Sequence, residues 1–144
     1  MTAKSAEPRD RTQMEQGTQA TSSRLFDLIG LKGKTTEPGP GPLPCEGYED
    51  GTIQMIHPWS IYDLPFEELE KGYATMRTTL PKEGWKVVSD GPAANRAKTP
   101  TIVADSPDGD YSAELQLVDR RKDPTAKTKF VLSVTVVSRC FQPS

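Results

Sequence analysis

The two cysteines are the residues whose chemistry is most easily interpreted from the sequence. Cys45 follows a Pro/Gly run and Cys140 lies near the end of the chain, so the pair brackets the region that is rich in core-forming side chains. Thiols placed in this way are typical of a disulfide, and disulfides persist in oxidising compartments. The pair predicts a Cys45–Cys140 disulfide and an extracellular location, with two buried free thiols as the alternative. Two distant thiols and one histidine are too few ligands for a structural zinc site, so no metal site is predicted.

His57 is the sole histidine and stands in the sequence Ile56-His57-Pro58-Trp59. A histidine can act as a general base or as a pH-sensitive contact. No serine or cysteine in a recognisable nucleophile elbow lies near it in the sequence, and no acidic partner is implied. We therefore favour a histidine at the end of a strand that bonds to backbone, and we keep a catalytic role as the alternative.

Two aromatic side chains, Trp59 and Tyr62, lie in a segment that reads as a loop beside the start of a helix. Exposed aromatic residues on a loop are typical anchors for a protein partner or a sugar ring. Together with His57 they are the candidate partner-binding residues. For both aromatics we favour packing over the edge of a sheet, with a binding surface as the alternative, and Trp85 is expected in the core.

Charged residues exclude some functions and leave others open. The net charge is −2 and no basic stripe is visible, which disfavours nucleic acid as a partner. Asp105, Asp108 and Asp110 invite a calcium interpretation, but a solvated hairpin tip explains them better because the closing glutamate of an EF-hand is missing. A basic cluster over 120–129 could contact anionic lipid or wall polymers, although a solvated turn is the simpler reading. No phosphate-binding glycine loop is found, and no cofactor is predicted.

The positions of the apolar residues predict the domain organisation. Residues 1–44 hold few large apolar side chains and cannot bury a core alone, because ordering a residue costs about 1–2 kcal/mol of backbone entropy. We expect 1–44 to be a flexible tether with a short amphipathic helix at about 20–30 and a Pro/Gly linker. Residues 45–144 are expected to form one globular domain. The sequence has no apolar stretch of 18 or more residues, so it predicts no transmembrane helix.

Hydrophobic periodicity predicts the elements of this domain. An apolar stripe with steps of three or four residues indicates a helix over 65–81. Period-two alternation and flanking turn residues indicate strands over 52–57, 85–88, 101–104, 111–118 and 130–137. The predicted fold class is α+β: an antiparallel sheet of about five strands, with the main helix on one face and the N-terminal helix able to cover part of the other.

Several segments occur in an order that is familiar. A short helical segment (24–30) precedes a Pro/Gly linker (37–41) and a cysteine; farther on come LPKEGW (80–85) and VVSRCF (136–141). In these features the chain resembles small secreted lipoproteins of actinobacteria, a family of uncharacterised function. The resemblance implies a lipid-bearing N-terminus and a polar tether, although the lipid-attachment cysteine of that family is absent from this sequence. It brings no catalytic residues.

These observations lead to one expectation and two alternatives. We expect a non-enzymatic, envelope-associated protein that is anchored to the outer face of the cytoplasmic membrane and binds a protein or a cell-wall component. Contact with the membrane would come only through an N-terminal lipid. One alternative is a small secreted hydrolase that uses His57 with nearby carboxylates. The other is a cytosolic adaptor with reduced thiols.

Overall fold

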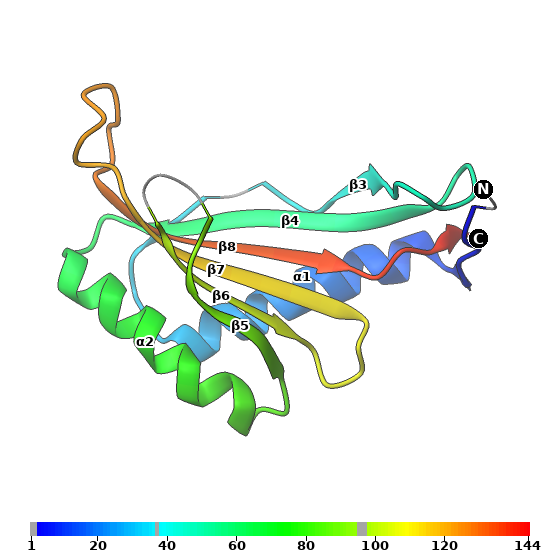
Figure 1. Cartoon of the computed structure of the whole chain (residues 1–144), viewed down its shortest axis with the longest axis horizontal. Helices are drawn as coiled ribbons and strands as arrows, with labels where there is room; N and C mark the ends of the chain where they lie inside the picture. Colours follow the sequence, from blue (N-terminus) through cyan, green and yellow to red (C-terminus); the bar gives the residue numbers. More distant parts are fainter. Residues whose placement is uncertain (1–2, 37, 95–97) are drawn as a thin grey trace.

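The computed structural model describes residues 3–36, 38–94 and 98–144, and it shows an α+β fold (Figure 1). Within these residues the chain forms two helices, a seven-stranded antiparallel sheet of order β2-β4-β8-β7-β6-β5 with β3 also paired to β4, and a separate parallel pair, β1-β9. The elements in chain order are β1 (Pro8–Arg9), α1 (Arg11–Ile29), β2 (Lys34–Thr35), β3 (Gly41–Pro44), β4 (Ile53–Tyr62), α2 (Phe66–Lys82), β5 (Lys86–Pro92), β6 (Pro100–Asp105), β7 (Tyr111–Asp119), β8 (Phe130–Ser138) and β9 (Gln142–Pro143).

The predicted fold class is confirmed at the level of an α+β fold with an antiparallel sheet, but its details are wrong in two respects. The sheet has seven strands rather than about five, because β2 and β3 add to β4. Both helices pack on the same face of the sheet, as Figure 1 shows, so α1 does not cover the opposite face. One continuous core forms between this face and the two helices, and it includes Leu25, Leu69, Trp85, Leu115 and Val134.

Helix α1 begins nine residues before the expected position at residue 20, with Asp10 as its N-cap. The Asp10 carboxylate accepts a hydrogen bond of 2.8 Å from the Gln13 backbone N–H, and Gly30 ends the helix with φ 72°. Before Leu25, the buried face of α1 consists of one large apolar residue, Met14, followed by the small polar residues Thr18 and Ser22. The buried stripe is Met14, Thr18, Ser22, Leu25 and Ile29.

Helix α2 confirms the helix predicted over 65–81, since its buried stripe contains Leu69, Tyr73, Met76 and Leu80. Glu67 and Glu68 lie in its first turn, where carboxylates interact favourably with the helix dipole. Because α2 contacts β5, β7 and β8, it covers the half of the sheet that α1 leaves open.

Strand β3 forms within a segment that the sequence analysis treats as an unpaired Pro/Gly linker. In its register with β4, Gly41 lies opposite Ile56 and Leu43 lies opposite Gln54. The prolines fall at alternate positions, so their missing N–H groups point away from β4 while the backbone groups of the intervening residues can pair. Proline is tolerated in an edge strand in this way.

Strand β4 does not stop at Pro58, where the sequence predicts its end, but continues to Tyr62. The backbone N–H and C=O of Ser60 both face residue Thr36, so Pro58, two residues away, faces the same edge of the strand. Pro58 lies between the part of β4 that pairs with β3 and the part that pairs with β2. Its missing N–H therefore costs no ladder hydrogen bond, and Pro58 remains paired in register with Thr135 of β8.

The Cys45–Cys140 disulfide is present and joins the end of β3 to the segment after β8. A small second core of Met14, Met55 and Phe141 lies among the same elements. Across the predicted boundary at residue 44, β1 pairs with β9 and Lys4 pairs with Tyr48. Figure 1 shows both chain ends at one end of the long axis, opposite the β7–β8 hairpin.

A glycine in α1 permits close packing against β7. A Cβ atom at Gly17 would overlap the Tyr111 hydroxyl oxygen, and the nearest ring carbon would lie 3.2 Å away. Glycine costs about 1 kcal/mol relative to alanine inside a helix. The absence of a side chain here is therefore explained by the contact with the strand.

We expect Gly17→Ala to lower the free energy of unfolding by about 1–2 kcal/mol, because the overlap outweighs the gain in helix propensity. Removal of the hydroxyl with Tyr111→Phe should relieve the overlap, so Gly17→Ala should be neutral or stabilising in that background. Urea unfolding of the four variants of this cycle measures the coupling. Equal costs in both backgrounds would contradict the contact.

Candidate functional site

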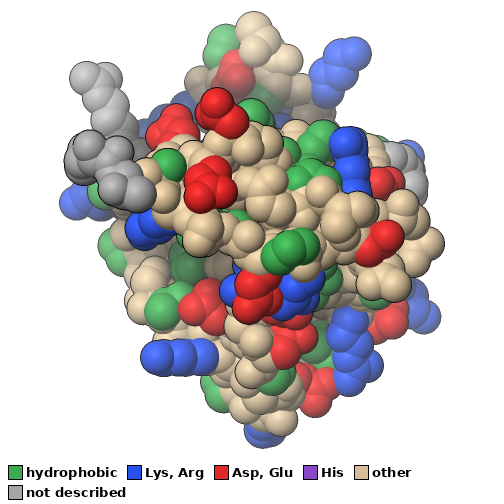
Figure 2. Space-filling view, turned by 90° about the vertical axis from the view of Figure 1, so that its right-hand side faces the viewer, with side chains coloured by type: hydrophobic (Ala, Val, Ile, Leu, Met, Phe, Trp, Pro, Cys, Tyr) green, Lys and Arg blue, Asp and Glu red, His purple; other side chains and the backbone are tan. Residues whose placement is uncertain are grey.

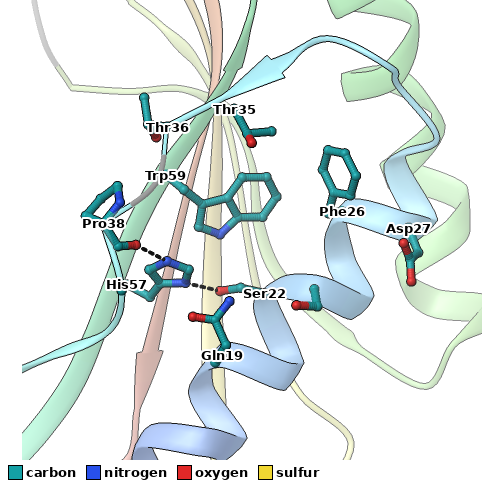
Figure 3. A pocket seen from close by; sticks show the side chains of 11 residues that line it. Gln19, Ser22, Phe26, Asp27, Thr35, Thr36, Pro38, His57 and Trp59 are labelled. Carbon is teal, nitrogen blue, oxygen red and sulfur yellow. Dashed lines mark hydrogen bonds between the residues drawn. The ribbon is translucent and has the colours of Figure 1, made fainter.

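A cleft with a volume of about 360 Å³ lies between α1, β4 and the chain segment that connects β2 to β3 (Figure 3). We call residues 35–36 and 38–39, which run from the last residue of β2 toward β3, the strap, and the hollow the α1–β4 cleft. Its lining residues come from three elements: Gln19, Ser22, Ser23, Phe26 and Asp27 from α1; Thr35, Thr36, Pro38 and Gly39 from the strap; and His57 and Trp59 from β4.

His57 ties the three walls together. Its Nδ1 atom lies 2.7 Å from the Ser22 hydroxyl oxygen, and its Nε2 atom lies 2.7 Å from the Pro38 carbonyl oxygen. A carbonyl can only accept, so Nε2 carries a proton and donates it to Pro38. In the neutral ring Nδ1 is then the acceptor, and the Ser22 hydroxyl donates to it. Both ring nitrogens of this buried side chain are satisfied, which fixes the strap against the helix.

Trp59 differs from His57 because its indole N–H has no hydrogen-bond partner among the described residues. The side chain is only 6% exposed, and its indole Nε1 is buried with no hydrogen-bond partner among the described residues. Figure 3 shows the nitrogen-bearing edge of the indole turned toward Ser22 and His57. The ring also meets Phe26 edge-on, with centroids 6.1 Å apart. A buried donor without an acceptor costs about 1–3 kcal/mol.

The described part of the rim is polar and includes the carboxylate of Asp27. The Asp27 side chain is exposed, and its carboxylate has no ion-pair or hydrogen-bond partner in the described part of the chain. Among the described lining residues Asp27 is the only one with a formal charge, and no lysine or arginine is present. Hydroxyl and amide groups of Gln19, Ser23 and Thr35 complete the rim. The described lining of the cleft therefore offers several hydrogen-bond acceptors and no cationic donor.

The structure brings together two of the three predicted binding residues. His57 and Trp59 are two apart on β4, so both point toward α1. Tyr62 has the opposite parity and lines a separate hollow of about 470 Å³ with Lys34, Lys127 and Lys129. The expected loop over 58–62 is wrong because these residues continue β4, and this is why Trp59 is buried rather than exposed.

The sequence analysis missed the contribution of α1 to the cleft. Gln19, Ser22, Ser23 and Phe26 recur at helical spacing, and this spacing is the one signal that could have placed them on a single face. An apolar stripe does not include these positions, because Gln19, Ser22 and Ser23 are polar. The pairing of Ser22 with His57 spans 35 residues and leaves no local pattern.

Two charged clusters noted in the sequence make local contacts. At the tip of the β6–β7 hairpin, hydrogen bonds from the Ser106 hydroxyl and the Asp110 backbone N–H hold the pKa of the Asp108 carboxyl below its usual value. In the basic hairpin, Arg121 pairs with Asp119 and stacks over Phe130. No group of three or more potential metal ligands occurs among the described residues. On the end of the molecule seen in Figure 2, acidic and basic side chains are interspersed.

None of the described helices has the length and apolar character needed to cross a membrane. Comparison of the chain with protein families, with curated proteins and with solved structures finds no match.

We expect Ser22→Ala to lower the free energy of unfolding by about 1–3 kcal/mol, because it leaves Nδ1 of a buried histidine without its donor. Ser23→Ala is the matched control, since Ser23 is the exposed neighbour on the same helix turn and its loss should change stability by less than about 0.5 kcal/mol. Urea unfolding measures both. Equal effects would show that the Ser22–His57 bond contributes nothing.

Proposed function

We propose that the protein is a non-enzymatic binding module of the cell exterior, associated with the envelope, and that the α1–β4 cleft is its binding site. The disulfide is compatible with an extracellular location. The single observation that carries the choice of site is the buried, unpartnered Nε1 of Trp59 in the wall of a cleft. An orphaned donor in a hollow is a place where a ligand acceptor gains a hydrogen bond without displacing an existing one.

The walls of the cleft are suited to binding without large rearrangement. One wall is a helix, the floor is a central strand, and the strap is held by His57 and by the Thr36–Ser60 pairing. Sites built on packed elements bind with less loss of conformational freedom than sites on free loops. The cleft size is at the lower end of the range for small-ligand pockets, which favours one residue or sugar unit of a larger partner.

The proposal predicts that the oxidised protein is retained by actinobacterial envelope fractions and that the cleft is responsible. Retention on isolated walls and on membranes is measured by co-sedimentation. Asp27→Asn and Trp59→Phe should each reduce it several-fold, because one alters the exposed rim and the other removes the orphaned donor. Asp63→Asn is the matched surface control, since this exposed aspartate lies outside the cleft.

Retention that is unchanged in both cleft variants would overturn the assignment of the site. Absence of retention by any fraction, with wild-type unfolding behaviour intact, would overturn the binding function itself. Asp27→Asn changes an exposed side chain, so its result does not depend on whether Trp59→Phe folds normally.

A second candidate function is hydrolysis by acyl transfer, and the Ser22–His57 hydrogen bond favours it. Nucleophile, base and an orienting acceptor follow in the order Ser22, His57, Pro38 carbonyl, with both distances at 2.7 Å. The carboxylates expected in the sequence analysis do not take part, because neither nitrogen of His57 bonds to an acid. Ser22 is only 3% exposed, which is why we prefer the binding function.

A fluorophosphonate probe separates the two functions, because it modifies serines that a neighbouring base activates. The binding function predicts that Ser22 stays unmodified after prolonged incubation, as read by peptide mass spectrometry. Stoichiometric modification of Ser22 that disappears in a folded His57→Gln variant would establish the hydrolase instead. A serine hydrolase of known activity in the same tube controls for the probe.

A further inference from the structure

We propose that the ligand of the α1–β4 cleft is a neutral, hydroxyl-rich ring, that is, a saccharide unit of an extracellular polymer. This inference rests on the proposed function and names the ligand class of the same site. Three properties of the cleft support it: an unused donor at its inner end, acceptor groups and the carboxylate of Asp27 among the described residues of its rim, and an aromatic edge beside them.

The inner donor requires a ligand with an acceptor atom. Nε1 of Trp59 is closed off from water and from every described acceptor, whereas both nitrogens of the adjacent His57 are occupied. Within the cleft, Trp59 is therefore the buried side chain whose hydrogen-bonding capacity a ligand can complete. A hydroxyl or ring oxygen supplies one acceptor at this point without bringing a charge into a buried site.

The rim selects against anions. The carboxylate of Asp27 would repel a phosphate or carboxylate, and no lysine or arginine among the described lining residues would compensate. The same carboxylate accepts strongly from hydroxyl groups, as do the oxygens of Thr35 and Gln19. A ligand with several O–H donors and no negative charge fits this arrangement.

The aromatic pair gives the ring a place to pack. Phe26 is half-buried, lines the cleft and meets Trp59 edge-on, so part of its ring borders the hollow. Carbon-bound hydrogens on one face of a sugar ring can pack against such a surface while the hydroxyls reach the rim. The volume of about 360 Å³ accommodates one or two rings.

Because Nε1 of Trp59 is closed off from water, a ligand reaches it only when a neighbouring side chain moves. Gln19 is exposed, and Figure 3 shows its amide beside Ser22 at the edge of the site. We infer that Gln19 turns aside as the ligand enters. The Thr36–Ser60 and Pro38–His57 bonds keep the strap in place during this change.

The test uses the oxidised full chain with Trp85→Phe, which leaves Trp59 as the only tryptophan and makes its fluorescence specific for the cleft. Neutral disaccharides of glucose, galactose, mannose and arabinose are titrated up to about 10 mM, so that dissociation constants down to millimolar strength are detected. The tightest is then compared with its amino-sugar and uronic-acid counterparts. We expect saturable perturbation by a neutral sugar and at least tenfold weaker binding of the uronic acid.

Variants locate the bound sugar by calorimetry. Trp59→Phe should weaken binding by about fivefold or more, the value of one hydrogen bond. Asp27→Asn, on the exposed rim, should remove most of the discrimination against the uronic acid, and Asp63→Asn should change neither quantity.

Each outcome decides for or against the ligand class. Tightest binding of the amino sugar's cation or of the uronic acid would overturn a neutral ligand. Absence of binding by every neutral sugar would overturn the saccharide, and the proposed function would still stand if envelope retention depended on Asp27. Loss of both sugar binding and cleft-dependent retention would remove the ligand class and the site together.

Discussion

The structure depends on one covalent closure between residues that are 95 positions apart in the chain, Cys45 and Cys140. In the chain-entropy treatment, closing a loop of this length stabilises a fold by about 4–5 kcal/mol, which is a large share for a domain of this size. The bond fixes the end of β3 to the segment after β8, next to the small core that seats the first turns of α1. The strap begins at β2 and ends at β3, so the disulfide also anchors one end of the cleft wall.

Among the described residues, the buried side-chain polar groups are satisfied with two exceptions, the indole N–H of Trp59 and the hydroxyl of Tyr73. His57 uses both nitrogens to link a helix, a strand and a connection, which is the kind of fully satisfied network that specifies a single arrangement. Four residues from Ser22 along α1, Phe26 packs on Trp59, whose indole N–H has no partner. Local violations of hydrogen-bond satisfaction tend to occur at functional sites. The contrast between His57 and Trp59, two positions apart on one face of β4, is the feature on which the proposed binding site depends.

Sequence reasoning recovered the elements whose pattern is local. The apolar stripe of α2 and the alternation of β7 and β8 are strong because each repeats over several turns or residue pairs. It failed where tertiary pairing decides. Pro58 reads as a strand end, yet it faces a gap in the edge. The Ser22–His57 hydrogen bond joins residues 35 positions apart, so no local pattern indicates it. The disulfide was predictable because the cysteines bracket the core, whereas the cleft was not, since its walls come from three distant segments.

The alternating prolines of β3 hinder strand pairing between copies of the protein that are crowded together. Exposed backbone along the rim of a sheet invites another chain to extend it, and this is a common route to fibres and swapped dimers. Pro42 and Pro44 lack the N–H that an incoming chain would need. At the other rim, β5 carries an irregularity between Val87 and Ser89 and ends at Pro92. Both borders of the sheet are thus blunted, so copies crowded side by side can stay separate.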